Sequence, residues 1–193
     1  QGQFEQALKK AKPLIGLLPK AIILYNIQGA SNAALKQYDA AIDSFKQALK
    51  IKPDHEEIYR NIGIALQDKG ELDAAIETYK QAIKIKPNYA EAYYNMGNAL
   101  KGKRELDAAI DSFKQAIQIK PDHEKAYSNM GIAFKEKGDL EEAIDSYKQA
   151  LKIKPDYAEG YYDMGVALQD KSDLDAAIDS YKQALKIKPD YAE

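Results

Sequence analysis

A spacing of 34 residues between recurrent prolines and glycines constrains this chain more than any other feature. Five prolines and five glycines keep this interval: Pro53, Pro87, Pro121, Pro155 and Pro189, and Gly29, Gly63, Gly97, Gly131 and Gly165. Residues 56–89 and 90–123 share 20 identical positions out of 34 when they are aligned at this interval. A period in this range is typical of stacked repeat units, each of which buries its apolar face against its neighbours. The sequence therefore predicts a tandem array.

Each repeat carries two apolar patterns with the period of an α-helix. In residues 56–89 the first pattern runs from Glu57 to Lys69 and the second from Leu72 to Ile85. Apolar residues recur three and four positions apart in both patterns, which places them on one face of each helix. Pro87 then ends the second pattern, because proline cannot continue a helix. We therefore expect an all-α chain built from helix pairs.

Turn residues mark where several of these helices begin and end. Gly70 and Gly138 follow the first helix of their repeats, where a left-handed residue commonly ends a helix. Asp139, with Glu142 three positions later, has the pattern of a capping box at the start of a second helix. Other repeats have a non-glycine residue at the first-helix end, and those turns are expected to be less relaxed; the residues are Lys36, Arg104 and Ser172.

The recurrent glycine predicts a close contact within each pair. Gly63 lies in mid-helix, where glycine costs about 1 kcal/mol relative to alanine. We interpret its recurrence as a place where the two backbones approach closely, with Ala75 on the opposite helix. A larger side chain at either position should overpack the contact, at a cost of about 1–3 kcal/mol.

One arrangement of these residues is characteristic of a known family. The pattern Tyr59-x-x-Ile62-Gly63-x-x-Leu66, followed by Ala75, Tyr79, Ala82 and Pro87, resembles the tetratricopeptide repeat (TPR), and it recurs from Tyr93, Tyr127 and Tyr161. Tyrosine stands where the family usually has tryptophan. The resemblance implies an all-α, right-handed superhelical solenoid of antiparallel helix pairs, in which the first helices line a concave groove.

The same alignment predicts the repeat boundaries. Residues 1–21 are expected to be the second helix of a preceding partial repeat, and five repeats should span 22–55, 56–89, 90–123, 124–157 and 158–191. Residues 192–193 are expected to start a truncated further repeat, because Tyr191-Ala192-Glu193 repeats Tyr157-Ala158-Glu159. We therefore expect the natural protein to continue beyond both ends, and an exposed apolar end to contact another copy.

A row of amides is the leading candidate for a binding site. Asn61, Asn95, Asn129 and Asp163 each lie two residues before the recurrent glycine. An asparagine side chain both donates and accepts, so a stacked row could bond the main chain of an extended peptide. This row resembles the repeat domain of the O-linked N-acetylglucosamine transferases, which implies peptide binding. The alternative is that these asparagines cap or bridge neighbouring helices without any ligand.

Other first-helix positions extend the candidate groove. The main candidates there are Arg60, Tyr94, Asn98, Lys101, Lys125, Ser128 and Tyr162, and further positions include Ile64, Gln67, Lys135 and Gln169. The charges are mixed. The basic set with which chaperone-binding members clamp a terminal carboxylate is not reproduced, since Arg60, Tyr94, Ser128 and Tyr162 occupy one line. A carboxylate clamp of that kind is therefore not expected.

Composition and spacing argue against several other functions. The chain has no Cys, a net charge of −2 and only two histidines, His55 and His123, which lie two repeats apart. We interpret both histidines as solvent-facing turn residues, and we expect no metal, no cofactor and no general nucleic-acid binding. Lys101-Gly102-Lys103-Arg104 lacks the glycines of a phosphate-binding loop. The most apolar stretch, residues 13–27, is short and carries Lys20, so no membrane span is expected.

The sequence thus favours a non-catalytic interaction scaffold that binds an extended peptide segment of a protein partner. No nucleophile–base set or metal cluster indicates an enzyme. Two alternatives stay open: a substrate-recognition arm of a larger glycosyltransferase-like or sulfotransferase-like enzyme, and a scaffold that self-assembles by end-to-end stacking. The absence of Cys, of a signal peptide and of an apolar span favours a cytoplasmic location.

Overall fold

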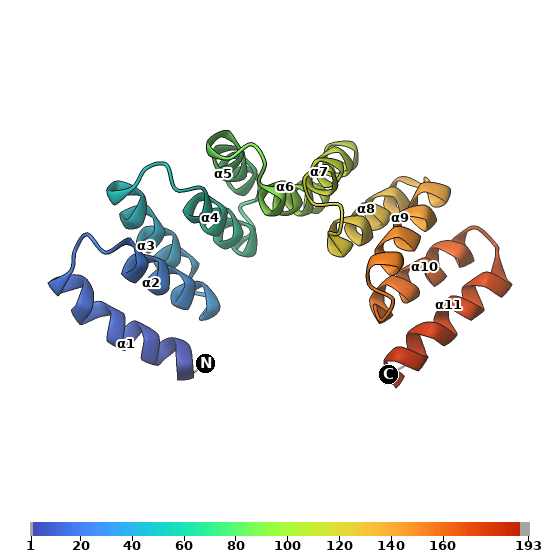
Figure 1. Cartoon of the computed structure of the whole chain (residues 1–193), viewed down its shortest axis with the longest axis horizontal. Coiled ribbons are helices and arrows are strands. Elements are labelled where there is room, and N and C mark those ends of the chain that lie inside the picture. Colours follow the sequence, from blue (N-terminus) through green and yellow to red (C-terminus); the bar gives the residue numbers. More distant parts are fainter. Residues whose placement is uncertain (1, 190–193) are drawn as a thin grey trace. The chain divides into compact units, whose positions relative to one another are not determined.

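The computed structural model describes residues 2–189, and every regular element in that range is an α-helix. The helices form two compact units, residues 1–99 and 100–193, with the boundary inside one helix (Figure 1). The predicted start of a further repeat at 192–193 lies outside the described residues. The helices are α1 (Gly2–Leu17), α2 (Ile22–Ala34), α3 (Tyr38–Ile51), α4 (Glu56–Lys69), α5 (Leu72–Ile85), α6 (Ala90–Gly102), α7 (Leu106–Ile119), α8 (Glu124–Lys137), α9 (Leu140–Ile153), α10 (Ala158–Asp170) and α11 (Leu174–Ile187).

Each unit is a stack of antiparallel helix pairs joined by short turns. In unit 1, residues 1–99, α2 packs on α3 and α4 packs on α5, and α3 also contacts α4. In unit 2, residues 100–193, the pairs are α8 with α9 and α10 with α11, and they are linked by contacts of α7 with α8 and of α9 with α10. The second helix of one pair thus covers the first helix of the next. This is the solenoid arrangement expected from the 34-residue period.

The local signals place the helix ends in most repeats. Gly70 and Gly138 end α4 and α8 with φ of 90° and 92°, in the left-handed region. Lys36, Arg104 and Ser172 adopt the same conformation with φ of 59°, 62° and 68°, although L side chains are disfavoured there. The lysine before each proline of the 34-residue period, such as Lys86 with φ −129° and ψ 90°, is extended, as a residue before proline prefers to be.

The predicted capping box at Asp139 is wrong. Asp139 is the N-cap of α9, but its side chain makes no capping hydrogen bond. Its carboxylate lies 3.2 Å from Lys137 Nζ, so the ion pair replaces the cap. Among the other second helices, the Asp173 carboxylate does accept from Ala176 N–H, at a long 3.4 Å. His55 and His123, the N-cap residues of α4 and α8, are partly buried rather than fully solvent-facing.

The recurrent glycine makes room for an aromatic ring, not for the opposite backbone. A Cβ atom added at Gly131 would lie 2.7 Å from Tyr147 Cε1, and one at Gly165 would lie 2.6 Å from Tyr181 Cε1. Gly63 faces Tyr79 in the same way. The expected partner of Gly63 was Ala75, so this detail of the prediction is corrected. The aromatic ring of the second helix fills the space that the missing side chain leaves.

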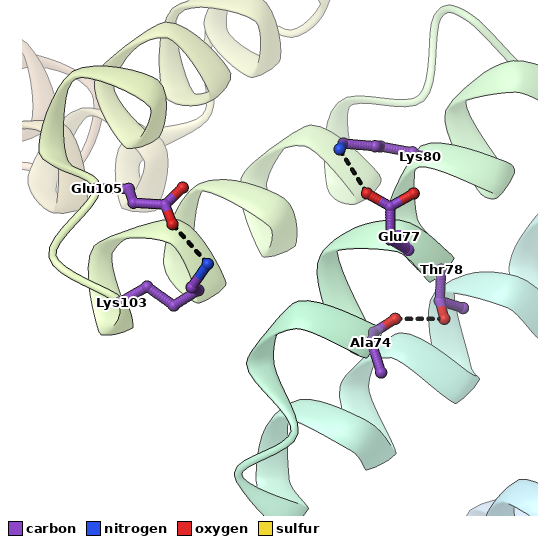
Figure 2. A network of polar contacts seen from close by, with 6 residues as sticks. All are labelled: Ala74, Glu77, Thr78, Lys80, Lys103 and Glu105. Carbon is purple, nitrogen blue, oxygen red and sulfur yellow. Dashed lines mark hydrogen bonds and ion pairs between the residues drawn. The ribbon is translucent and has the colours of Figure 1, made fainter.

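Polar groups on the second helices are satisfied locally. Thr78 Oγ1 donates to the Ala74 carbonyl at 2.7 Å, which lets a hydroxyl sit near the core (Figure 2). Serines at the same position of other second helices do likewise; they are Ser44, Ser112, Ser146 and Ser180. Figure 2 also shows two short-range surface ion pairs, Lys80 with Glu77 at 2.6 Å and Lys103 with Glu105 at 2.5 Å. These hydroxyl groups on the second helices therefore need no partner from another helix.

Candidate functional site

The first helices expose a polar face that their second helices do not cover, and we call it the first-helix face. In α4 it carries Arg60, Asn61, Ile64 and Gln67, whereas Ile62 and Leu66 on the other side are buried. The corresponding residues of the other first helices form the same face in each unit. Every residue of the predicted groove belongs to one of these helices.

In unit 1, an amide pair joins the first-helix faces of α2 and α4. Asn61 Nδ2 donates to Asn26 Oδ1 at 3.2 Å, and Arg60 Nη2 donates to Asn61 Oδ1 at 3.3 Å. All three side chains are partly buried. Asn26 lies one position earlier in its repeat than Asn61 does, because Ile27 occupies the equivalent position. The Asn26 side chain nevertheless bonds Asn61 and so continues the row of amides onto α2. Tyr94, Asn95 and Asn98 lie on α6, and each is also partly buried.

A tyrosine of the second helix α5 forms a hydrogen bond with a residue at the edge of this face. The Tyr79 hydroxyl of α5 donates to Gln67 Oε1 of α4 at 3.1 Å. The Tyr79 side chain is fully buried, and this burial raises its pKa above the ordinary value for tyrosine. The bond therefore satisfies a buried donor and holds the Gln67 amide at the edge of the first-helix face.

In unit 2, the amide of Asn129 bonds two lysine residues on the first-helix face. Lys101 Nζ donates to Asn129 Oδ1 at 2.9 Å, and Asn129 Nδ2 donates to the Lys125 carbonyl at 3.1 Å. Lys101 and Asn129 are partly buried, whereas the Lys125 side chain is exposed. Burial lowers the pKa of Lys101, and the carboxylates of Glu136 and Asp163 act in the opposite direction.

Asp163 of α10 lies among these lysines. Burial raises the pKa of its carboxyl group, and the positive charges of Lys135 and Lys101 act against that shift. The charge of Asp163 also contributes to the raised pKa of Tyr147, after burial of that ring, so Asp163 lies near the Tyr147 hydroxyl. The last row position of unit 2 is therefore a partly buried carboxylate with two lysines and a tyrosine nearby.

The remaining predicted residues differ in exposure. Tyr162 is 43% exposed, and its ring lies 5.7 Å from that of Tyr181 between centroids. Ser128, in contrast, is 2% exposed. The Ser128 hydroxyl is therefore not presented to a ligand, and we correct the set by leaving it out of the site.

The tyrosine–glutamine bonds are the part of the site that sequence reasoning missed. Tyr79 with Gln67 and Tyr181 with Gln169 are both separated by 12 residues, and Tyr181 donates to Gln169 Oε1 at 2.9 Å. Tyr79 belongs to the recurrent pattern of the second helix, and that pattern by itself indicates no polar contact. The repeated 12-residue spacing of a first-helix glutamine and a second-helix tyrosine was the available signal.

Within residues 2–189, no group of three or more His, Asp or Glu side chains is placed to hold a metal ion. Over the same residues, no helix combines the length and the apolar character that crossing a membrane requires. The first-helix face presents hydrogen-bond donors, hydrogen-bond acceptors and charged groups on neighbouring helices.

Comparison with known proteins agrees with this architecture. Two family models match: "TPR repeat" at residues 29–70, 65–104 and 131–172, and "Tetratricopeptide repeat" at residues 90–123 and 158–191. No curated protein sequence matches the chain significantly.

Several solved structures have the same fold. A crystal structure of MamA is 30% identical with a TM-score of 0.77, and the match covers 85% of this chain and 96% of that one. A thermophilic TPR protein of Thermus thermophilus is 25% identical with a TM-score of 0.70, covering 89% of this chain and 94% of that one. YrrB, described as a TPR protein with an unusual peptide-binding site, is 18% identical with a TM-score of 0.72, covering 94% of each chain.

The family models and the 30% identical structure lead to one assignment. Proteins with these repeats are interaction scaffolds that bind protein or peptide partners. The chain belongs to the tetratricopeptide repeat family.

Proposed function

We propose that the chain holds an extended segment of a partner protein along its first-helix face. The observation that carries this proposal is the row of partly exposed amides and charged groups on neighbouring first helices. In unit 1 the row includes Asn26 and Asn61, and in unit 2 it includes Lys101, Asn129 and Asp163. A row of donors and acceptors matches the main chain of an extended peptide, which has one donor and one acceptor at each non-proline residue.

The row also joins neighbouring first helices. Asn61 bonds Asn26 at 3.2 Å, and Lys101 bonds Asn129 at 2.9 Å, so these side chains bridge helices without a ligand. Asn61 nevertheless has a second amide N–H beyond the bond to Asn26. A peptide carbonyl could accept that N–H while the bridge persists, so the bridging and binding interpretations are compatible.

A similar role is described for one structural neighbour. YrrB has the same fold and is described as having a peptide-binding site. Its 18% identity does not carry any residue across, so the binding residues of this chain have to be tested on their own.

A peptide array gives the test. The labelled chain is incubated with an array of unrelated peptides, and the affinity of the strongest binders is measured in solution. We expect replacement of both Asn61 and Asn129 by alanine to weaken binding by at least about fivefold, because each lost hydrogen bond contributes about 0.5–1.5 kcal/mol. Asn88→Ala is the matched control, because Asn88 is an exposed turn residue between α5 and α6.

The stability of each variant separates the two roles of the row. If the double variant unfolds earlier in denaturant but binds the selected peptides as tightly as the native chain, the row is structural only. Unchanged binding in a fully folded variant would therefore contradict the proposed function.

Self-association is the second candidate, and the exposed residues of α11 favour it. Leu174 is 60% exposed, Ile178 is 50% exposed and Leu185 is 40% exposed, so α11 presents an apolar strip. Large exposed apolar strips commonly mark contact surfaces. Sedimentation velocity over a range of concentrations tests this candidate: replacement of Leu174 and Ile178 by glutamate should abolish any concentration-dependent species.

A further inference from the structure

One buried hydroxyl in unit 2 lacks the partner that its counterparts have. Tyr79 and Tyr181 donate to Gln67 and Gln169 at 3.1 and 2.9 Å. The Tyr147 side chain is fully buried, and its hydroxyl has no hydrogen-bond partner. Buried hydroxyl groups are ordinarily hydrogen-bonded, and leaving one unsatisfied destabilises the protein. The exception therefore calls for a physical reason.

The reason lies in the residue 12 positions before Tyr147. Lys135 stands where α4 has Gln67 and α10 has Gln169. A glutamine carbonyl oxygen accepts the tyrosine proton, whereas an ammonium group has no acceptor. This repeat thus lacks the tyrosine–glutamine bond that two other repeats have, and it carries a positive charge at the position of the glutamine.

A second ammonium group lies close by. Lys101 is partly buried and donates to the neutral Asn129 amide oxygen at 2.9 Å. Within residues 100–189, neither Lys101 nor Lys135 has a carboxylate oxygen within 4.0 Å. Asp163 is the partly buried acid whose charge acts on both lysines and on Tyr147. The positive charges of two partly buried lysines thus act on one partly buried carboxylate.

We propose that Lys101, Lys135 and Tyr147, with Asn129 and Asp163 beside them, form a seat for an aspartate or glutamate side chain of the bound peptide. This inference rests on the proposed function and specifies the partner's chemistry. A ligand carboxylate balances the excess positive charge and accepts hydrogen bonds from both ammonium groups. In this seat the Tyr147 hydroxyl, which has no hydrogen-bond partner in the free chain, is the third donor.

The surroundings of the seat set its selectivity. Glu136 and Glu159 are exposed, so their charges are screened by solvent, and exposed Lys125 adds a further positive charge at the start of α8. Asp163 is partly buried, so its charge is screened less and repels a second carboxylate. Replacement of Asp163 by asparagine should therefore strengthen the binding of an acidic peptide.

Three synthetic peptides test the seat. Each is amidated at its C-terminus and differs only at alternate positions, which are all glutamate, all glutamine or all lysine. We expect the glutamate peptide to bind the full chain about tenfold more tightly than the glutamine peptide, and the lysine peptide to bind most weakly. A glutamine peptide with a free C-terminus checks for a terminal carboxylate as the source, and it should bind no better than its amidated form.

Lys135→Gln is the decisive variant, because glutamine occupies this position in two other repeats. It restores an acceptor for Tyr147, so the variant should have a higher midpoint of unfolding than the native chain. It removes one ammonium group, so the glutamate peptide should bind about tenfold more weakly. Lys148→Gln makes the same change in charge on the outer side of α9, where Lys148 pairs with Asp145 at 3.6 Å, and it should leave binding unchanged.

The reciprocal variant gives a gain of function in unit 1. Gln67→Lys releases the Tyr79 hydroxyl, which should lower the midpoint of unfolding and favour the glutamate peptide over the glutamine peptide. Equal affinity of the native chain for the glutamate and glutamine peptides would overturn the seat but leave the proposed function standing. The seat is also wrong if Lys135→Gln binds the glutamate peptide at full strength. Failure of all three peptides to bind would contradict both proposals.

Discussion

At the scale of single residues, some positions carry the residue that their backbone conformation or packing requires, and others carry a residue that is strained there. Gly131 faces the ring of Tyr147, and Gly70 has a left-handed backbone at φ of 90°. Lys36 has the same left-handed conformation without the freedom of glycine. The repeat pattern predicted where these residues lie, but not which group fills the space beside Gly131. A recurrent glycine is expected both where an aromatic ring packs against the helix and where another backbone approaches it closely.

Gly131→Ala tests the ring contact. The new Cβ would lie 2.7 Å from the fully buried Tyr147 ring, so we expect the free energy of unfolding to fall by about 1–3 kcal/mol. Gly16→Ala is the control, because a Cβ at Gly16 meets no atom within 4 Å in α1. Chemical denaturation of both variants checks the prediction, and equal stability of the two would contradict it.

Lys36→Gly tests the strained turn after α2. Glycine adopts a φ of 59° without the cost of about 1 kcal/mol that an L side chain incurs there. We expect a higher midpoint of thermal unfolding for this variant, whereas the reverse change Gly70→Lys should lower it. A lower midpoint of thermal unfolding for Lys36→Gly would contradict this prediction, because it would mean that the lysine side chain stabilises the fold by more than its left-handed backbone destabilises it.

Asp163 predicts a specific dependence of stability on pH. Its pKa is raised in the folded chain by burial, so the folded state holds the proton more tightly than the unfolded state does. Stability from this group therefore falls as pH rises from below the unfolded pKa to above the folded pKa. Asp163→Asn should stabilise the chain at neutral pH, and the gain should vanish in acid. Denaturation curves at several pH values measure this, and a gain that grows in acid would contradict it.

At the scale of helices, the sequence predicted most of what the structure contains. The expected second helix from Leu72 to Ile85 matches α5, and the first helix was placed from Glu57 against an observed start at Glu56. Proline, glycine and apolar period are local signals, so they can be read without the fold. The Asp139 cap failed because an ion pair with Lys137 competes for the same carboxylate, and that competition depends on side-chain rotamers.

Ion pairs at the ends of first helices link successive repeats. Lys137 Nζ at the end of α8 lies 2.9 Å from Asp107 of α7, and Lys69 lies 2.6 Å from Asp39 in the equivalent place of unit 1. Lys171 pairs with Glu141 at 2.7 Å in the same way. We expect Lys137→Ala to lower the melting temperature slightly in dilute buffer. The difference from the native chain should disappear near 1 M salt, because the Debye screening length is then only about 3 Å. A difference that persists at high salt would contradict an ionic origin.

At the scale of the whole molecule, the repeat identifies the family while the partner has to be found by experiment. The period and the TPR pattern were sufficient to predict an all-helical array. The candidate site was harder to predict. The sequence singled out Asn61, Lys101 and Asn129 as candidates, and their role in binding stays a prediction. The bond of Asn61 to Asn26 and that of Lys101 to Asn129 depend on side-chain distances that no spacing encodes. The Tyr147 hydroxyl lacks the hydrogen bond that Tyr79 and Tyr181 make, and the apolar pattern that these three tyrosines share does not distinguish them.

Side-chain amide NMR tests the central claim most directly. The chain is labelled with ¹⁵N and titrated with a peptide selected from the array, and the Asn61 and Asn129 amide signals are assigned with the alanine variants. We expect both signals to shift as peptide is added, while the Asn88 signal stays in place. Shifts confined to the outer surfaces of the second helices, with Asn61 and Asn129 unmoved, would contradict binding at the first-helix face.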